Sequence, residues 1–332
     1  MSYGINKLRQ RLDICPAEDL GPRLPFLVEG MKDLLQKLAE VERLAQGSRW
    51  QRLLNAPGKY VFAMGFRALV YARTRRARPA TVPTFFGLSM QVMLPAGTDL
   101  YLLGAKSHDS EIRLARLLLR HLRPGDTFVD VGGHFGYFTL LASQLVGAAG
   151  RVVAFEASKA THAVLAANVR ARANITAHHL ALSDRHETIR FFEFPVLYNE
   201  FNSMDVDQFR GEKWFAEFPP QQIDVPAVRL DDIVQRDDLR PAVIKIDVEG
   251  AELKVIRGAA DTLRRLRPLV VMEYLAPDRH NTAHREAAAL LRELGYVSFA
   301  PAPDGQLEPC ADLDGYLTRH GIESANFAFQ KP

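Results

Sequence analysis

The sequence has few of the features that mark secreted, disulfide-bonded or membrane-spanning proteins. Only 2 of its 332 residues are cysteine, Cys15 and Cys310, and no CxxC pattern occurs, which argues against a disulfide framework and a zinc site. The longest apolar-rich run, 60–72, contains Arg67 and is shorter than the roughly 20 residues that a bilayer span needs. The first residues lack the apolar core of a signal peptide, so we expect a cytoplasmic, reducing location.

A strong excess of either charge is also missing. The 42 basic and 39 acidic residues leave a formal charge of +3, which does not suggest a nucleic-acid partner. Locally, four arginines follow the apolar run 60–72, namely Arg73, Arg75, Arg76 and Arg78. A basic end on an apolar helix is typical of a solvated helix C-terminus or of peripheral contact with an anionic membrane, and both interpretations stay open.

Composition and periodicity predict an α/β protein. Hydrophobic residues make up 47% and charged residues 24% of the chain, close to the globular average, so a sizeable core is available. Short apolar segments are candidate strands, at 128–131, 152–155, 175–182, 242–246, 269–273, 297–300 and 326–329. Because helical patterns separate the early segments, we expect a mostly parallel sheet with helices on both faces.

The remaining segments define the expected domain organisation. Apolar residues at helical spacing predict helices over 28–45 and 60–72, so residues 1–95 are assigned to an N-terminal, mainly helical extension. This extension is expected to pack on the main domain, to act as a lid or to form a homodimer. Residues 96–332 form the main domain, preceded by a predicted strand or hairpin at 84–103. Its aromatic-rich insertion, 187–229, is too long for a plain connection.

The loop after the first predicted strand is a candidate ligand site. It reads DVGGHFG from Asp130, with Gly132, Gly133 and Gly136, and a long apolar helix pattern follows. Dinucleotide sites have the pattern G-x-G-x-x-G, but His134 stands where the second glycine belongs. The loop is therefore not prepared for a pyrophosphate, and the carboxylate before it would repel one.

A second acid follows the second predicted strand. Glu156 lies 20 positions beyond Gly136, which is the spacing of the acid that binds ribose hydroxyls in nucleotide sites. A ribose without a pyrophosphate, beside an acid that suits a cationic group, points to S-adenosylmethionine (SAM). After the third strand, Ser183 and Asp184 offer acceptors for the adenine amine, and an ordinary Ser-Asp turn is the alternative.

The segment VIKIDVEGAE, 243–252, concentrates charge at the end of an apolar strand. Lys245 and Asp247 share a strand face by the two-residue period, as does Glu249 if the strand continues. Burying such groups is costly unless they are paired or needed. We predict that Asp247 or Glu249 takes or orients the proton of an acceptor hydroxyl and that Lys245 tunes that carboxylate. A purely structural ion pair is the alternative.

Six segments, spanning about 109–274, resemble the FkbM-type SAM-dependent methyltransferase family in sequence and order: FVDVGGHFGYFTLLAS, VVAFEAS, HLALSD, VRLDDIV, VIKIDVEGAELKVIRGA and RPLVVMEY. The resemblance implies a Rossmann-like class I methyltransferase fold with a seven-stranded, mostly parallel sheet. It also implies O-methylation of a sugar or natural-product hydroxyl. The family usually has Ala-Asn where this chain has Gly133-His134, so no role is carried over for that asparagine side chain.

The acceptor is expected beside the insertion, where aromatic and amide side chains alternate as in pockets for sugars or polyketides. The residues predicted to bind it are Tyr198, Asn202, Ser203 and Glu273.

A metal is not expected. The candidate ligands are Asp247, Glu249, Glu273, His280 and His284. The two histidines lack the intervening glutamate of an HExxH site, and their position at a helix start favours capping or solvent exposure. Two other functions stay open: an NAD-dependent oxidoreductase or epimerase, against which His134 argues, and a non-catalytic SAM-fold module that works by interaction.

Overall fold

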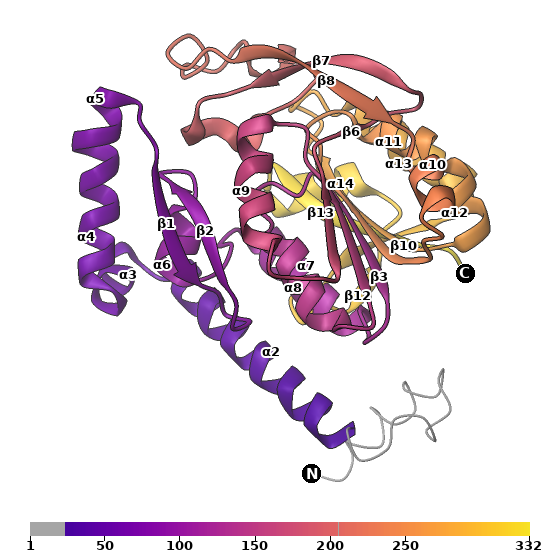
Figure 1. Ribbon diagram of the computed structural model, residues 1–332, viewed down its shortest axis with the longest axis horizontal. Helices are drawn as coiled ribbons and strands as arrows, with labels where there is room; N and C mark the ends of the chain where they lie inside the picture. The colour runs from indigo at the N-terminus through magenta and orange to yellow at the C-terminus, as the bar shows by residue number, and fades with distance from the viewer. Residues whose placement is uncertain (1–23, 205) are drawn as a thin grey trace.

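The computed structural model describes residues 24–204 and 206–332, and its centre is an eight-stranded sheet (Figure 1). The strand order is β12-β11-β13-β10-β9-β3-β4-β5. The strands are β3 (Thr127–Val131), β4 (Arg151–Phe155), β5 (Ile175–His178), β9 (Pro241–Ile246), β10 (Leu269–Leu275), β11 (Val297–Pro301), β12 (Leu307–Pro309) and β13 (Ser324–Gln330). The five strands from β10 to β5 are parallel, and β13 runs antiparallel between β10 and β11.

Helices cover both faces of this sheet, as the alternation of strand and helix predicts (Figure 1). On one face Phe128 belongs to a core with α7 (Asp109–His121), α8 (Tyr137–Val146) and α9 (Lys159–Val169). Its neighbour Val129 belongs to the core of the other face, because successive strand residues point to opposite sides. The helices of that second core are α10 (Leu230–Arg236), α11 (Glu252–Gly258), α12 (Ala260–Leu266), α13 (Thr282–Glu293) and α14 (Leu313–His320).

The predicted α/β fold with a mostly parallel sheet and N-terminal helices is confirmed, with three local differences. The three-residue edge strand β12 makes eight strands instead of seven. The predicted strand 175–182 is divided, because β6 (Ala181–Leu182) leaves the main sheet and pairs with β8 (Gln221–Val228). The predicted hairpin at 84–103 is formed earlier, by β1 (Arg78–Pro83) and β2 (Ser89–Leu94), and α6 (Thr98–Leu103) is a helix.

The insertion 187–229 is a structured unit. β7 (Glu187–Glu193) pairs antiparallel with β8, and with β6 they form a three-stranded sheet beyond one end of the main-sheet strands (Figure 1). Between these strands, the 3-10 helices η3 (Val196–Phe201) and η4 (Asp207–Phe209) carry a cluster of aromatic rings. Tyr198 stacks on Trp214 with ring centroids 4.2 Å apart.

The N-terminal extension joins both the main domain and the insertion. Leu38 and Val41 of α2 (Leu24–Gln46) share a core with α7 and α8. A run of helices, with a break at Ala56, then forms the outer edge of the molecule (Figure 1). It consists of α3 (Arg49–Asn55), α4 (Pro57–Gly65), the π-helix η2 (Phe66–Tyr71) and α5 (Ala72–Thr74). Phe66 and Tyr71 pack against Phe218 of the insertion. Within the described part of the chain, no helix is both long and apolar enough to cross a membrane.

Candidate functional site

The strand order places a ligand site at the carboxyl ends of β3 and β9. From β3 the chain continues to β4 and β5 on one side, whereas β9 and β10 lie on its other side. Such a topological switch point leaves a crevice at the carboxyl ends of the strands. A cavity of about 1740 Å³ lies there. It is lined by one residue at or near the carboxyl end of each of four neighbouring strands: Gly132, Glu156, Asp247 and Glu273.

The glycine loop is held tightly between the neighbouring strands. Gly132 has φ +81°, and a Cβ atom there would lie 1.8 Å from the carbonyl oxygen of Asp247. Only glycine therefore lets the end of β3 come this close to the end of β9. On the other side, the N–H groups of Gly132 and Gly133 both donate to the carbonyl of Phe155, at 3.0 and 2.9 Å.

A buried ion-pair network lies beneath this loop. The Lys245 ammonium is 3.4 Å from Asp130 Oδ1 and 3.2 Å from Asp247 Oδ2, and it donates to the Gly132 carbonyl at 3.1 Å. Burial alone would lower the pKa of Lys245, but the two carboxylates outweigh it and raise the pKa. Asp130 also accepts a hydrogen bond from Thr139 at 2.6 Å. Neither Asp130 nor Lys245 lines the cavity, so both support the site from below.

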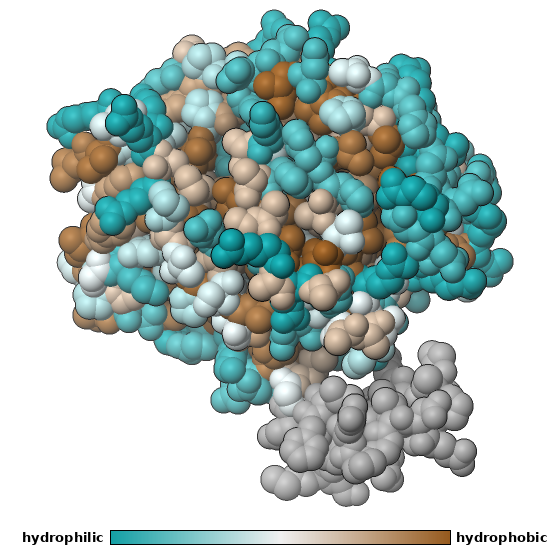
Figure 2. Space-filling view, in the orientation of Figure 1, coloured by the Kyte–Doolittle hydropathy of each residue, from teal (hydrophilic) through white to brown (hydrophobic). Residues whose placement is uncertain are grey.

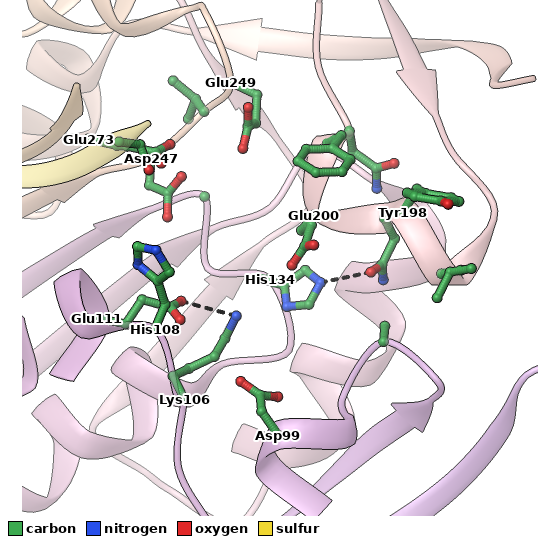
Figure 3. Close-up of a pocket in the computed structure, with 18 of the residues that line it drawn as sticks. Asp99, Lys106, His108, Glu111, His134, Tyr198, Glu200, Asp247, Glu249 and Glu273 are labelled. Atoms are coloured by element: carbon green, nitrogen blue, oxygen red, sulfur yellow. Dashed lines mark hydrogen bonds and ion pairs between the residues drawn. The ribbon is translucent and has the colours of Figure 1, made fainter. Parts of the chain in front are cut away.

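Three carboxyl groups, those of Asp247, Glu249 and Glu273, meet at one wall of the cavity, with oxygens within 4.8 Å of one another (Figure 3). Burial would raise the pKa of Asp247, but Lys245 outweighs it and lowers that pKa. Burial and neighbouring carboxylates raise the pKa values of Glu249 and Glu273 well above the ordinary range. Asp247 therefore carries a negative charge more readily than its neighbours, whereas the two glutamates take up protons more readily than ordinary carboxyl groups.

These three carboxyl groups are also the described residues that have the spacing to hold a metal ion. The histidines considered with them lie elsewhere. His280 lines the cavity, and His284 lies 3.3 Å from Glu252 in a buried contact. Glu252 in turn accepts the N–H groups of Val248 and Gly250, so this pair shapes the turn that carries Glu249.

Glu156 presents a pre-positioned carboxylate to the cavity. Its two oxygens accept the backbone N–H groups of His134 and Ser158, each at 2.9 Å. Burial raises the pKa of Glu156 to about 7, and the two N–H donors act in the opposite direction. Each oxygen keeps a lone pair for a further donor, so this residue can accept hydroxyl groups of a bound ligand.

His134 connects the glycine loop to the insertion. Its backbone has φ +48°, a left-handed conformation that His, Asn and Asp adopt more often than most other residues. Its Nε2 lies 3.2 Å from Oδ1 of Asn199 in η3, as the dashed line in Figure 3 shows. Burial, with a smaller effect from Lys106, lowers the pKa of His134 to about 3. The imidazole is therefore neutral and serves as a hydrogen-bonding group.

Several cavity residues give no signal in the sequence. Figure 3 shows Asp99, Lys106 and Glu111 opposite the three-carboxylate wall, with Glu200 between them. Lys106 pairs with Glu111 at 3.1 Å, and burial raises the pKa of Asp99 to about 6. Asp99 and Glu111 lie in the first turns of α6 and α7, where acids are common for local reasons. Only the tertiary structure shows that these two acids face the cavity and are not ordinary helix-start residues.

The structure brings together about half of the predicted site residues. Those that line the cavity are Gly132, His134, Glu156, Tyr198, Asn202, Asp247, Glu249 and Glu273. Those that do not are Asp130, Gly133, Gly136, Ser183, Asp184, Ser203 and Lys245. Ser183 and Asp184 follow β6 in the small sheet, and the Ser183 hydroxyl donates to Glu187 at 2.9 Å, an arrangement that fits a turn. Asn199, one of the amides of the aromatic-rich insertion but not among the residues predicted to bind the acceptor, also lines the cavity.

The N-terminal extension contributes the far side of the cavity. Arg49, Arg52, Tyr60 and Arg67 line it, opposite the sheet edge and near Trp214 of the insertion. Binding pockets for single drug-sized ligands occupy about 300–1,000 Å³. A cavity of about 1740 Å³ therefore has room for a cofactor together with a sizeable second ligand.

Comparison with known proteins identifies one family. A model of the methyltransferase FkbM domain matches residues 130–298, about half of the chain. The 31-O-demethyl-FK506 methyltransferase FkbM of Streptomyces tacrolimicus is 31% identical over 222 residues, covering 57% of this chain and 81% of that protein. The hexuronic acid methyltransferase AglP of Haloferax volcanii is 25% identical over 158 residues, covering 47% of this chain and 59% of that protein.

Among solved structures, a methyltransferase FkbM from Methylobacillus flagellatus KT aligns with a TM-score of 0.39 and 14% identity. The alignment covers 70% of this chain and 52% of that one.

Proposed function

The chain belongs to the FkbM methyltransferase family, and from this premise we propose that it transfers a methyl group from SAM to a hydroxyl of a sugar or natural product. The names of the two relatives support this acceptor class, because one names a demethylated natural product and the other a hexuronic acid. The size of the cavity agrees with an acceptor that binds beside the cofactor.

One observation carries the proposal: the carboxyl group of Asp247, paired with Lys245, lies at the switch point directly beside the glycine loop. The carbonyl oxygen of this residue touches Gly132, and its carboxylate pairs with Lys245 at 3.2 Å and faces the cavity. A carboxylate held by Lys245 at this place can accept a proton from a bound hydroxyl group.

The residues around the loop fit SAM. When bound, SAM supplies a methyl group on a positively charged sulfur. The Glu156 carboxylate, already fixed by the N–H groups of His134 and Ser158, would accept the ribose hydroxyls. The contact between His134 and Asn199 would hold the glycine loop against the insertion.

The chain's own residues then position the acceptor and handle its proton. Asp247 would accept or orient the hydroxyl proton as the methyl group passes from the sulfur of SAM, which leaves as the neutral thioether, to the acceptor oxygen. Lys245 would hold the carboxylate in its charged form beforehand. The aromatic insertion, with Tyr198 stacked on Trp214, would hold the acceptor in line and exclude water.

The decisive experiment separates cofactor binding from turnover. Asp247→Asn should lose about 10²–10⁴-fold in turnover, the usual contribution of a general base, while SAM affinity by calorimetry changes little. Glu249→Gln tests the alternative base, and Asp184→Asn, outside the cavity, is the matched control. Turnover is measured as transfer of a labelled methyl group to a panel of sugar and polyketide hydroxyls.

Each of the other possible outcomes would support a different function or a different catalytic base. Near-normal turnover of both Asp247→Asn and Glu249→Gln would contradict the assignment of the base. Binding of NAD instead of SAM would favour an oxidoreductase, and SAM binding without turnover on any acceptor would favour a non-catalytic module. Loss of turnover in EDTA that magnesium restores would assign the three carboxylates to a metal.

A further inference from the structure

The basic and acidic residues are unevenly distributed along the chain, although the net charge of the whole chain is small. Residues 43–98 contain 9 arginines or lysines and no aspartate or glutamate, which leaves 33 basic and 39 acidic residues in the rest of the chain. The basic residues are Arg43, Arg49, Arg52, Lys59, Arg67, Arg73, Arg75, Arg76 and Arg78. The segment 43–98, which contains helices α3 to α5, is therefore cationic on a chain that is otherwise net acidic.

The same helices expose apolar side chains. Of the six large hydrophobic side chains that are exposed in the described residues, five lie here, with exposed fractions of 44% to 79%: Trp50, Leu54, Val61, Leu69 and Val70. We call these five, with the exposed Arg73 and Arg76, the α3–α5 face. Figure 2 shows hydrophobic side chains among hydrophilic ones along the edge of the molecule that these helices form. Five of six such side chains on one segment, next to exposed arginines, make this edge a candidate interaction surface.

The α3–α5 face is not needed to hold the protein together. The packing contacts of these helices come from other residues, since Phe66 and Tyr71 point inward to Leu94 and Phe218. Some cations are also engaged internally: Arg75 pairs with Glu217 and lies over the Phe218 ring. By contrast, three further cations, Arg67, Arg73 and Arg76, form no ion pair with any residue that the structure describes.

We propose that the α3–α5 face docks the protein on an anionic phospholipid bilayer, as a peripheral contact. In this arrangement the tryptophan and aliphatic side chains enter the interfacial region, where Trp is enriched, and the arginines meet the lipid headgroups. Because Arg49, Arg52 and Arg67 of the same helices line the cavity, a docked bilayer would lie one helix layer from the acceptor site.

Charge favours this occupant over the alternatives. In a two-fold dimer, the same patch meets itself, so the cations of two copies would face each other without a compensating acid in 43–98. A nucleic acid would satisfy the arginines but not the exposed Trp50 and Leu54, since such interfaces are predominantly polar. An anionic bilayer satisfies both kinds of side chain.

The test uses flotation of the full chain with vesicles of phosphatidylcholine alone and of phosphatidylcholine mixed with phosphatidylglycerol. We expect binding to the anionic vesicles only, weakening as salt is raised. Each arginine near such a surface contributes about 1 kcal/mol, so Arg73→Gln with Arg76→Gln should weaken binding roughly 30-fold. Trp50→Ser with Leu54→Ser should weaken it roughly tenfold or more, because their apolar surface no longer enters the interface.

Matched controls are available on the same chain. Arg170→Gln with Arg240→Gln makes the same charge change at exposed positions elsewhere, and Val297→Ser changes the sixth exposed hydrophobic residue. Neither control should alter vesicle binding. None of the substituted side chains lines the cavity, so SAM binding and thermal unfolding should stay at wild-type values and show that each variant is folded.

Three results would overturn the proposal. The first is no binding to anionic vesicles even at low salt, and the second is equal loss of binding in the control variants. The third is evidence that the face binds another partner and not vesicles. This would be a dimer in sedimentation analysis that dissociates when Trp50→Ser is combined with Leu54→Ser. It would equally be binding of duplex DNA that is abolished when Arg73→Gln is combined with Arg76→Gln.

Discussion

Replacing Lys245 by methionine tests whether the buried ion-pair network holds the candidate site together. Methionine is unbranched like lysine and only one atom shorter, and it removes the charge. The Lys245 and Asp130 side chains are 3% and 1% exposed, and breaking a buried pair by removing one partner costs about 3–5 kcal/mol. The Asp247 side chain is 37% exposed, so its pair adds at most about 1 kcal/mol. We therefore expect the free energy of unfolding to fall by about 3–5 kcal/mol near neutral pH.

The loss should depend on pH, with a definite sign. In the wild type the pKa of Lys245 is raised, so its contribution is fully present below the unfolded value of about 10.4. The pKa of Asp247 is lowered, so its contribution is present above about 3.9. In the variant, buried Asp130 loses its cation, and burial raises its pKa further. Over this pH range Asp130 holds a proton in the folded variant but not in the unfolded chain. The stability of the variant relative to the wild type therefore falls as pH rises.

Urea unfolding of both proteins at about pH 5.5 and about pH 8 measures this effect, with the larger difference expected at the higher pH. Lys37→Met is the matched control, because Lys37 pairs with Asp33 at 2.7 Å on the surface, with side chains 52% and 57% exposed. Its loss should stay below about 0.5 kcal/mol. A Lys245→Met protein within about 1 kcal/mol of wild type at both pH values would refute the reasoning, because a buried unpaired carboxylate cannot cost so little.

Three further predictions concern the loop and its acid. Gly132→Ala should lower the free energy of unfolding by about 3 kcal/mol or more, measured with heat or urea. The new Cβ atom would lie 1.8 Å from a backbone oxygen, and the backbone there has a left-handed φ of +81°. Gly133→Ala should be tolerated, because its Cβ atom would have its nearest contact at 3.4 Å. His134 has φ +48°, which asparagine adopts readily and valine does not. His134→Asn should therefore keep wild-type stability, whereas His134→Val should lower the free energy of unfolding by about 1–3 kcal/mol. Equal losses of stability in the two variants would contradict this reasoning. Because the pKa of Glu156 is raised to about 7, SAM affinity by calorimetry should fall as pH drops below that value, and Glu156→Gln should flatten the profile.

The sequence predicts the strand ends of the site because their pattern is local. The apolar runs before Asp130, Glu156 and Asp247 identify parallel strands, and parallel strands bring their carboxyl ends to one edge of a sheet. The two-residue period predicts that Lys245 and Asp247 share a face, and they do form an ion pair at 3.2 Å. The glycine at 132 is similarly explained by one backbone contact.

Local patterns fail where a segment changes partner. The stretch 175–182 contains no glycine or proline that would predict a break, yet Ala181 and Leu182 leave the main sheet and pair with Ala227 and Val228 of the insertion. The roles of Ser183 and Asp184 were inferred from the undivided strand, and this division places them outside the cavity. A pairing partner some 45 residues away leaves no period in the strand itself.

By itself, the sequence determined the α/β class, the order of strands and helices, and the acids that end the central strands, because each depends on neighbours a few positions apart. Only the tertiary structure decided what stands opposite those acids. It brings Asn199 to His134, Lys106 to the cavity and Arg49, Arg52 and Arg67 to its far wall. It also leaves the α3–α5 face outside. Such contacts depend on the packing of segments distant in the chain, for which a single sequence carries no repeating signal.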